Sequence, residues 1–444
     1  MQRYLSSLVI ALAAGQVAGA QEACPNAGLK LPAGFCATIF ADSLPNVRSI
    51  AVAPNGDLFV ALQNGRNPAV GGVMGLRDAG KTGKADKREK FVSGFASSHV
   101  AVFDNHLYAE VIPQAPARGS TAPPVTTTIV RYPLKSGELI PAGKPDTIIE
   151  KIPTFPGHST RNFAIAPDGS MYLNIGSPTN ACQPPAQDRA PTTPPGENPC
   201  TQLETRAGVW KFDARKTHQS PSAANHMARG IRNAVGIAVH PGDNKLWTTQ
   251  HGRDQLYDWR TKLGLDSAAA QKYNAENPAE ELMQVNQGDD FGWPYCYYAI
   301  DAKHLVLAPE YGGNGKEVGQ CASKKEPVGT FPGHWAPNAL MFYTGSEFPA
   351  KYKSGAFIAF HGSWNRAPEP QGGFNVVFQP LDASGKASGR YEVFADNFSP
   401  NVGRGRASAA SGAHRPTGLA QAADGSLYVA DDTGGRIYRI FFKK

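Results

Sequence analysis

The chain has 444 residues, of which 18% are charged, and it contains 47 glycines and 36 prolines. This low charged fraction and the many turn residues favour a turn-rich, all-β protein over one built from long solvated helices. The net charge is +7, but the basic residues are scattered and form no basic tail or basic helix, which argues against nucleic-acid binding.

The segment Met1–Ala20 has the pattern of a secretory signal peptide. Arg3 supplies the positive start, Leu5–Ala14 the short apolar stretch and Ala18–Ala20 a small-residue cleavage site. The apolar stretch is too short to cross a bilayer, and no later run reaches the roughly 18 apolar residues of a membrane helix. We therefore expect a secreted, extracellular protein without a membrane partner.

The six cysteines lie in three pairs that are close in the sequence: Cys24 and Cys36, Cys182 and Cys200, and Cys296 and Cys321. In an oxidising compartment disulfides are the expected state, and near-neighbour pairing is the simplest of the fifteen possible connectivities. None of the cysteines lies in a CxxC arrangement, so the spacing does not indicate a thiolate metal site.

One pattern recurs along the chain: an apolar strand, a tight turn with Pro, Asp, Asn or Gly, and a second apolar or aromatic strand. Its copies begin at Ile50, Val100, Phe163, Gly236, Ala339 and Gly418. The turn residues tolerate positive φ or preset the bend, so each copy predicts a β-hairpin. Third strands are expected to begin at Val73, Thr127, Gly208, Glu280, Phe374 and Arg436.

Six such antiparallel units predict a six-bladed β-propeller with four-stranded blades, formed by residues 21–444. A β-sandwich is the alternative, but its strands do not usually repeat one turn signature six times. Phe35–Asp42 has no hairpin of its own, and we expect it to close the ring as the outer strand of the last blade. Four inserts are expected as loops over one face: Pro113–Pro124, Asn180–Thr201, Thr261–Pro278 and Ala302–Pro327. Within the third insert, the segment Thr261–Asn277 has a composition that is typical of a helix.

In a propeller, the residues just before the innermost strands converge at one mouth of the central channel. These positions hold His99, His158, Arg232, Asn233, His334 and Arg415. Two segments that follow the second strand of a blade are expected at the same mouth: Thr249–Asp254, with His251, Gly252 and Arg253, and His361–Arg366, with Trp364 and Arg366.

These side chains include few carboxylates, so they predict a positive concavity that holds an anion. A guanidinium binds a carboxylate through two hydrogen bonds, which favours a polycarboxylate over a single phosphate. Trp364 is placed to stack on a flat ring. The carbonyls of Gly252 and its neighbour are candidate ligands for a hard cation such as Ca²⁺.

The motifs resemble the soluble quinoprotein glucose dehydrogenase and sorbosone dehydrogenase family, including the fungal pyranose dehydrogenases. The matching stretches are Gly157–Gly169, Gly230–Gly236, Gln250–Gly252, Asp290–Pro294, His361–Arg366 and Arg415–Asp432. The resemblance implies a propeller that holds pyrroloquinoline quinone (PQQ), a planar tricarboxylate, with Ca²⁺ at the channel mouth.

By position, His158 corresponds to the family's catalytic base, and the carbonyls of Gly252 and Arg253 correspond to its metal ligands. The positions interpreted as cofactor contacts are His99, Arg232, Asn233, His251, His334, Trp364, Arg366 and Arg415. The match of His334, Trp364 and Arg366 is looser. Arg232 is also assigned to catalysis, because with Ca²⁺ it would polarise the quinone oxygens.

Three departures from the family pattern stand out. The acid that precedes the base in the glucose dehydrogenases is replaced by Gly157, and the second of two arginines in the last blade is replaced by Thr417. Arg404 or Arg406 could compensate from the preceding loop. The sugar-binding loops of the glucose enzymes are not recognisable, so glucose specificity does not carry over.

The resemblance predicts oxidation of an aldose or a 2-keto-aldose at C1, with His158 taking the proton while hydride passes to the quinone. The chain has no CxxCH haem motif, so electrons would leave to an external acceptor such as a haem protein, a copper enzyme or a small quinone. Two alternatives remain: a Ca²⁺-dependent propeller lactonase, which needs several Asp, Glu or Asn metal ligands, and a non-catalytic propeller that binds a partner protein.

Overall fold

The computed structural model describes residues 24–63, 71–92, 95–113, 126–141, 143–154, 157–184, 187–189, 195–403 and 414–443. The predicted signal peptide Met1–Ala20 lies outside the described residues, as do Arg404, Arg406 and nearly all of the insert Pro113–Pro124. None of the described helices is long and apolar enough to cross a membrane.

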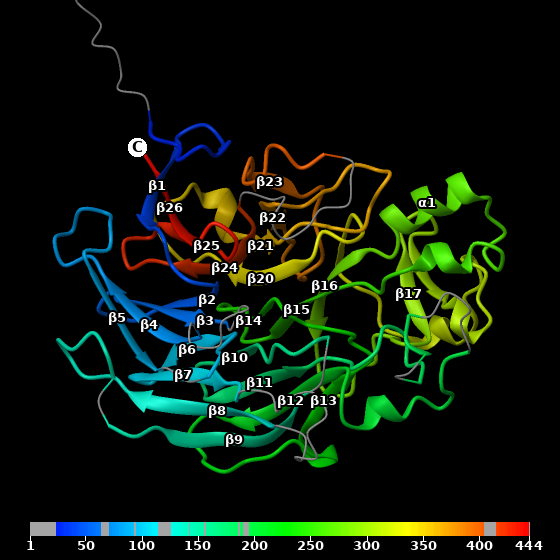
Figure 1. The fold of residues 1–444 in the computed structure, drawn as a ribbon, viewed down its shortest axis with the longest axis horizontal. Helices are drawn as coiled ribbons and strands as arrows, with labels where there is room; N and C mark the ends of the chain where they lie inside the picture. Colours follow the sequence, from blue (N-terminus) through cyan, green and yellow to red (C-terminus); the bar gives the residue numbers. More distant parts are fainter. Residues whose placement is uncertain are drawn as a thin grey trace, which may run out of the picture.

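Six four-stranded antiparallel sheets surround a common centre (Figure 1). Blade 1 contains β2 (Val47–Val52), β3 (Leu58–Leu62), β4 (Gly72–Arg77) and β5 (Lys87–Val92). Blade 2 contains β6 (Val100–Phe103), β7 (His106–Val111), β8 (Thr126–Pro133) and β9 (Asp146–Pro153). Blade 3 contains β10 (Phe163–Ile165), β11 (Ser170–Ile175), β12 (Gly208–Asp213) and β13 (His226–Arg229).

The other three blades have the same architecture. Blade 4 contains β14 (Ile237–Val239), β15 (Leu246–Gln250), β16 (Glu280–Val285) and β19 (Gly329–Phe331). Blade 5 contains β20 (Pro337–Phe342), β21 (Gly355–Phe360), β22 (Asn375–Pro380) and β23 (Glu392–Ala395). Blade 6 contains β24 (Pro416–Gln421), β25 (Leu427–Asp431), β26 (Arg436–Phe442) and β1 (Phe35–Ala41). The predicted six-bladed β-propeller is confirmed.

The innermost strands form a closed ring. Each contacts the next in the order β2, β6, β10, β14, β20 and β24, and β24 contacts β2 again. The ring is closed as predicted, because β1 pairs antiparallel with β26 and places Phe35 opposite Phe442. The buried ring of Phe35 also packs edge to face on Phe348 and Phe394 of blade 5. Burying a phenylalanine contributes about 1.5–3 kcal/mol, so this contact helps to hold the closing strand.

The inserts add small elements beside the ring. The expected helix is present as α1 (Ser267–Glu276), whose first turn is capped by the Asp266 carboxylate accepting from the amide of Ala269. A two-stranded sheet of β17 (Cys296–Ala299) and β18 (His304–Leu307) was not predicted. In Figure 1, α1 and β17 lie together at one side of the propeller. The 3₁₀ helices are η3 (Thr201–Glu204), η4 (Ala223–Asn225), η5 (Leu256–Trp259), η6 (Pro309–Tyr311), η7 (Gly319–Ser323) and η8 (Ala350–Lys353).

Three disulfides tie down the N-terminal segment and the inserts. They join Cys24 to Cys36, Cys182 to Cys200, and Cys296 to Cys321. The near-neighbour pairing is therefore confirmed. The second and third bridges close loops of the inserts, where little apolar core is available to hold the backbone.

Candidate active site

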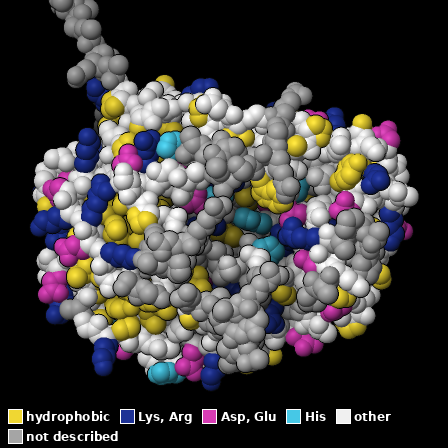
Figure 2. Space-filling model, in the orientation of Figure 1, with side chains coloured by type: hydrophobic (Ala, Val, Ile, Leu, Met, Phe, Trp, Pro, Cys, Tyr) yellow, Lys and Arg dark blue, Asp and Glu magenta, His cyan; other side chains and the backbone are white. Residues whose placement is uncertain are grey.

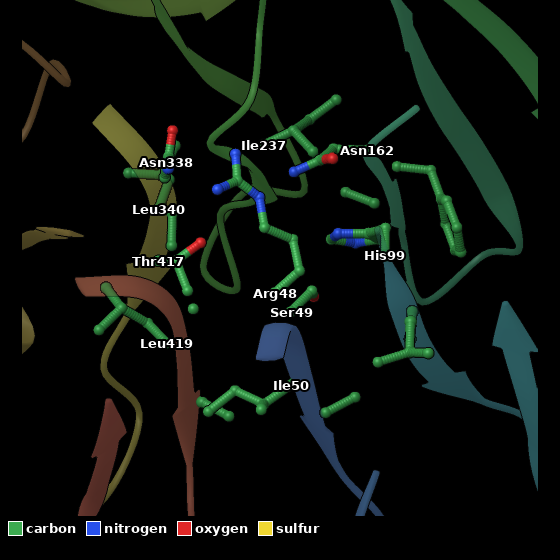
Figure 3. Close-up of a pocket in the computed structure, with 18 of the residues that line it drawn as sticks. Arg48, Ser49, Ile50, His99, Asn162, Ile237, Asn338, Leu340, Thr417 and Leu419 are labelled. Atoms are coloured by element: carbon green, nitrogen blue, oxygen red, sulfur yellow. The ribbon is translucent and has the colours of Figure 1, made fainter. Parts of the chain in front are cut away.

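A cavity of about 320 Å³ lies along the centre of the ring, and all six innermost strands contribute to its lining. The Arg48 side chain extends into the middle of this cavity, between Asn162 and Asn338 (Figure 3). Sequence reasoning missed Arg48, although this residue lies two positions before Ile50, where the first predicted hairpin begins. Its place was the available signal, because the candidates in blades 2 to 6 were taken from the same position.

His99 lies immediately before β6, as predicted, and lines the same cavity. Its ring packs edge to face on Phe163, with 4.7 Å between the centroids. Its Nδ1 atom is buried and has no hydrogen-bond partner among the described residues. Burial lowers the pKa of His99 to about 4, so this side chain is neutral at physiological pH.

His158 lies in the loop before β10, and its Nδ1 atom faces the Ser177 carbonyl oxygen at 2.8 Å. A carbonyl can only accept, so Nδ1 carries the proton and Nε2 is left unprotonated. Burial, followed by the charge of Arg232, lowers the pKa of His158 well below its usual value. The arrangement yields a neutral histidine with an unprotonated nitrogen, as a general base requires.

The backbone around His158 is held by a second, unpredicted residue. Arg161 is fully buried and donates through Nη1 to the carbonyl oxygens of His158 (2.6 Å) and Thr160 (3.0 Å). Gly176 packs against the same loop, because a Cβ atom there would lie only 2.9 Å from Cβ of His158. Arg161 and Gly176 thus fix the backbone of this loop, and the Ser177 carbonyl orients the His158 ring.

Arg232 lies in the loop before β14 and is only 3% exposed. Its guanidinium donates to the Gly252 carbonyl (2.9 Å), to the Asn180 side-chain oxygen (3.0 Å) and to Asp254 (3.2 Å). Burial lowers its pKa to about 10, against the opposing effect of Asp254. Its amide donates to the Gln250 side chain at 2.7 Å, which ties the loop to the end of β15.

Asp254 joins groups from several blades; the sequence placed it at the mouth within Thr249–Asp254 but predicted no role for it. Its carboxylate accepts from Arg232 (3.2 Å), Arg189 (2.8 Å) and Asn365 (2.9 Å), and it lies 3.6 Å from Nδ1 of His334. Although burial opposes the effect, the proximity of His334 and the charges of Arg232 and Arg189 hold the pKa of Asp254 well below its usual value.

A second carboxylate, that of Asp432, lies at the other side of the mouth. Asp432 accepts from Nε2 of His361 (2.9 Å) and from Arg48 (3.2 Å). Arg415 donates to the carbonyl oxygens of His361 (2.9 Å) and Gly362, and burial lowers its pKa. The expectation of few carboxylates at the mouth is therefore wrong, because Asp254 and Asp432 are paired there with the arginines.

His251 lies between Arg232 on one side of the mouth and Arg48 and His361 on the other. Its carbonyl oxygen lies 3.5 Å from Nη1 of Arg232, and its Nε2 lies 3.2 Å from the Pro337 carbonyl oxygen. Burial and then the charge of Arg232 lower the pKa of His251 to about 3, with smaller effects from Arg48 and His361. The structure thus brings together a contiguous cluster: His158, Arg232, Asn233, His251, Gly252, His334, His361 and Arg415. Histidine and basic side chains gather around a hollow near the middle of the face in Figure 2.

Three predicted site residues have side chains directed elsewhere. The Arg366 guanidinium donates to the carbonyls of Ala275 and Gly333 and pairs with Glu276, so it holds the end of α1. Trp364 is 39% exposed and lines a separate open groove. The Arg253 side chain pairs with buried Glu310, which leaves only its main chain near the mouth.

The TrAA12-like family model matches residues 120–442, which is most of the chain. The chain belongs to the TrAA12-like family. This assignment confirms the resemblance drawn from the sequence motifs.

The TrAA12-like chain is 28% identical over 298 residues to the pyrroloquinoline quinone-dependent pyranose dehydrogenase of Coprinopsis cinerea, covering 60% of this chain and 37% of that protein. It is 24% identical over 222 residues to an aldose sugar dehydrogenase of Escherichia coli, covering 50% and 51%. These alignments thus span about a third to half of the relatives' own length.

Solved structures share the fold of the TrAA12-like chain. The holo form of the PQQ domain of the C. cinerea pyranose dehydrogenase superposes with a TM-score of 0.66 at 20% identity, covering 93% of this chain and 97% of that one. A calcium structure of the Trichoderma reesei AA12 enzyme gives a TM-score of 0.67 at 17% identity, covering 94% and 98%. At these identities the likeness establishes the six-bladed fold.

The buried His99 makes the stability of the TrAA12-like protein sensitive to acid. Between pH 6.5 and about 4 the unfolded chain binds a proton at this residue that the folded chain does not. Stability therefore falls as the pH drops through this window, by up to about 3 kcal/mol from His99. We expect His99→Gln to lose less stability than wild type between pH 7 and 4.5, as measured by urea unfolding. The exposed His218→Gln is the control, and equal losses in all three proteins would contradict the prediction.

Proposed function

We propose that the chain is a secreted, PQQ-dependent sugar dehydrogenase. It oxidises an aldose or a 2-keto-aldose at C1 and passes the electrons to an external acceptor. One observation carries the proposal: the unprotonated Nε2 of His158 belongs to the same buried cluster as the Arg232 guanidinium. The C. cinerea relative is a pyranose dehydrogenase that depends on this quinone, and the three disulfides favour export.

The charge of the cluster fits a polyanionic cofactor. Four arginines, Arg48, Arg189, Arg232 and Arg415, lie in or beside the cluster, and three aspartates pair with them: Asp188, Asp254 and Asp432. His158 and His251 stay neutral because burial lowers the pKa of both. The buried guanidiniums of Arg232 and Arg415 can each bind a carboxylate through two hydrogen bonds, which favours a ligand with several carboxylates. We assign its binding to the channel-mouth residues His99, Arg232, Asn233, His251, His334 and Arg415.

The metal would be held by main-chain oxygens. We assign Ca²⁺ to the carbonyls of Gly252 and Arg253, since Ca²⁺ accepts carbonyl ligands readily. The Gly252 carbonyl accepts from Arg232 at 2.9 Å, so it is directed toward the anion-binding cluster. The described residues contain no group of three or more His, Cys, Asp or Glu side chains suited to a metal.

In the proposed reaction, His158 accepts the proton of the C1 hydroxyl at Nε2, while the Ser177 carbonyl keeps the proton on Nδ1. When bound, PQQ supplies the acceptor for the hydride. Arg232 provides positive charge where negative charge develops on reduction, inside a buried site where such an interaction is strong. Arg161 and Gly176 keep the His158 loop in place.

The test is an absorbance titration of the purified protein with PQQ and Ca²⁺, followed by a panel of aldoses and 2-keto-aldoses. We expect the quinone to bind and its spectrum to change to the reduced form when a suitable sugar is added. Hydrolysis of lactones without quinone would favour the lactonase. Absence of both quinone binding and hydrolysis would favour the propeller that binds a partner protein.

A further inference from the structure

Asn180 is the first residue of the insert between β11 and β12, and it is only 2% exposed. Its main chain is held from two sides: its nitrogen donates to the Asp188 carboxylate (2.8 Å), and its oxygen accepts from the indole of Trp293 (2.9 Å). Two residues later, Cys182 begins the disulfide that closes the insert. The backbone at Asn180 therefore has a fixed place, from which the side chain reaches two loops of blade 4.

The first of these loops carries Arg232. The Asn180 Oδ1 atom accepts from Nη2 of Arg232 at 3.0 Å, and the Asn180 main-chain oxygen accepts from Nε at 3.3 Å. A guanidinium is a rigid planar fork, so fixing two of its nitrogens fixes the plane and the position of its charge. One residue of the insert thus sets the orientation of a cation that belongs to another blade.

The second loop carries the main-chain oxygens assigned to the metal. The Asn180 Oδ1 atom accepts from the Asp254 amide at 2.9 Å, and Nδ2 donates to the Asp254 carbonyl at 3.0 Å. The Asp254 amide and the Arg253 carbonyl belong to one planar trans peptide, in which the two groups point in opposite directions. The hydrogen bond to the amide therefore also sets the direction of the Arg253 carbonyl.

These contacts are suited to an amide side chain. The oxygen of Asn180 accepts from Arg232 and Asp254, while its nitrogen donates to a carbonyl. A carboxylate would leave the Asp254 carbonyl without this donor, and an apolar side chain would leave two buried N–H groups without this acceptor. The side chain is therefore matched in both of its groups to the two loops that it joins.

We propose that Asn180 is a positioning residue that holds the Arg232 guanidinium for the cofactor and the Arg253 carbonyl for the metal. It acts through these two groups rather than by contact with either ligand. The inference rests on the proposed function and extends it, because a single buried amide then supports both PQQ binding and Ca²⁺ binding. Outer-shell partners of this kind contribute strongly to the affinity of a metal site.

The test is a double-mutant cycle of Asn180→Leu and Arg232→Gln in the full-length protein. PQQ binding is followed by absorbance titration at saturating Ca²⁺, and binding of Ca²⁺ alone is followed by calorimetry. We expect Asn180→Leu to weaken PQQ binding about tenfold or more when Arg232 is present. In the Arg232→Gln background the loss should be less than about threefold, because the guanidinium through which Asn180 acts is gone.

The Ca²⁺ titration should respond differently. Asn180→Leu is expected to weaken Ca²⁺ binding about tenfold in both backgrounds, because the direction of the Arg253 carbonyl does not depend on Arg232. If Asn180→Leu does not fold, Asn180→Ala removes the same hydrogen bonds with a smaller side chain and takes its place.

Gln219→Leu is the matched control, because Gln219 is also an amide that holds main-chain groups of blade 3. It accepts from the Asp213 amide (3.0 Å) and donates to the carbonyls of Asp213 and Lys216 (2.7 Å each). Asp213 pairs with Ser170, at the end of β11 that lies away from the mouth. The control should lose stability in urea while both ligand affinities stay as in wild type.

Three results would overturn the inference. They are an unchanged PQQ or Ca²⁺ affinity in Asn180→Leu, an equal loss of PQQ affinity in both backgrounds, and equal losses of affinity in Gln219→Leu. If wild type fails to bind PQQ or Ca²⁺, that part of the proposed function fails instead. The same cycle, measured by urea unfolding of the ligand-free protein, then decides: non-additive losses support the inference and additive losses overturn it.

Discussion

Replacing His158 with alanine is expected to lower kcat for the preferred sugar by about 10²- to 10⁴-fold, the range contributed by a positioned general base. The affinity for PQQ should change by less than a few-fold, because the neutral imidazole adds no charge to the cluster. Steady-state kinetics and quinone titration measure the two quantities separately. The matched control is His106→Ala, a histidine in a hairpin of blade 2 outside the mouth, which should behave as wild type.

The pH profile offers a second measurement on the same residue. The base must be unprotonated, and burial together with Arg232 holds the pKa of His158 well below 6.5. We therefore expect the rate in wild type to stay level from neutral pH down through 6.5 and to decline only in more acidic solution. Near-normal turnover in His158→Ala would show that another group takes the proton.

The fold could be predicted from the sequence because its information is local. Each blade repeats a hairpin whose turn residues are recognisable, so the ring and the closing strand Phe35–Ala41 followed from the pattern. The positions of His158, Arg232 and Arg415 followed as well, since each lies just before an innermost strand. The β17–β18 hairpin was missed because it belongs to an insert that the repeat does not describe.

The pairing of charges could not be predicted, because it depends on which loops meet across blades. Asp254 pairs with Arg189, which lies 65 residues away in the insert of blade 3, and Asp432 reaches Arg48 across the closure of the ring. Arg366 was expected at the mouth from its place after β21, but α1 packs beside it and engages its guanidinium. Contacts with the long inserts thus hold some side chains away from the channel mouth, where the blade pattern alone had placed them.

Asp254→Asn is expected to destabilise the cofactor-free protein by about 3 kcal/mol, the lower end of the range for breaking a buried ion pair. The substitution leaves the 3%-exposed Arg232 without its counter-charge. It also removes a negative charge beside the anion-binding cluster, so the affinity for PQQ should rise. Thermal unfolding with and without PQQ measures both effects, and Asp243→Asn in an exposed turn is the control.

Arg232→Gln should change the affinity for PQQ in the opposite direction. It removes a cation from the cluster and lowers PQQ affinity, while Asp254 keeps its partners Arg189 and His334. The double variant tests whether the two residues act as a pair. A neutral Gln–Asn pair leaves no buried charge unpaired, so the double variant should be more stable than Asp254→Asn alone. Additive losses would mean that Asp254 stabilises the mouth through Arg189 and His334 rather than through Arg232.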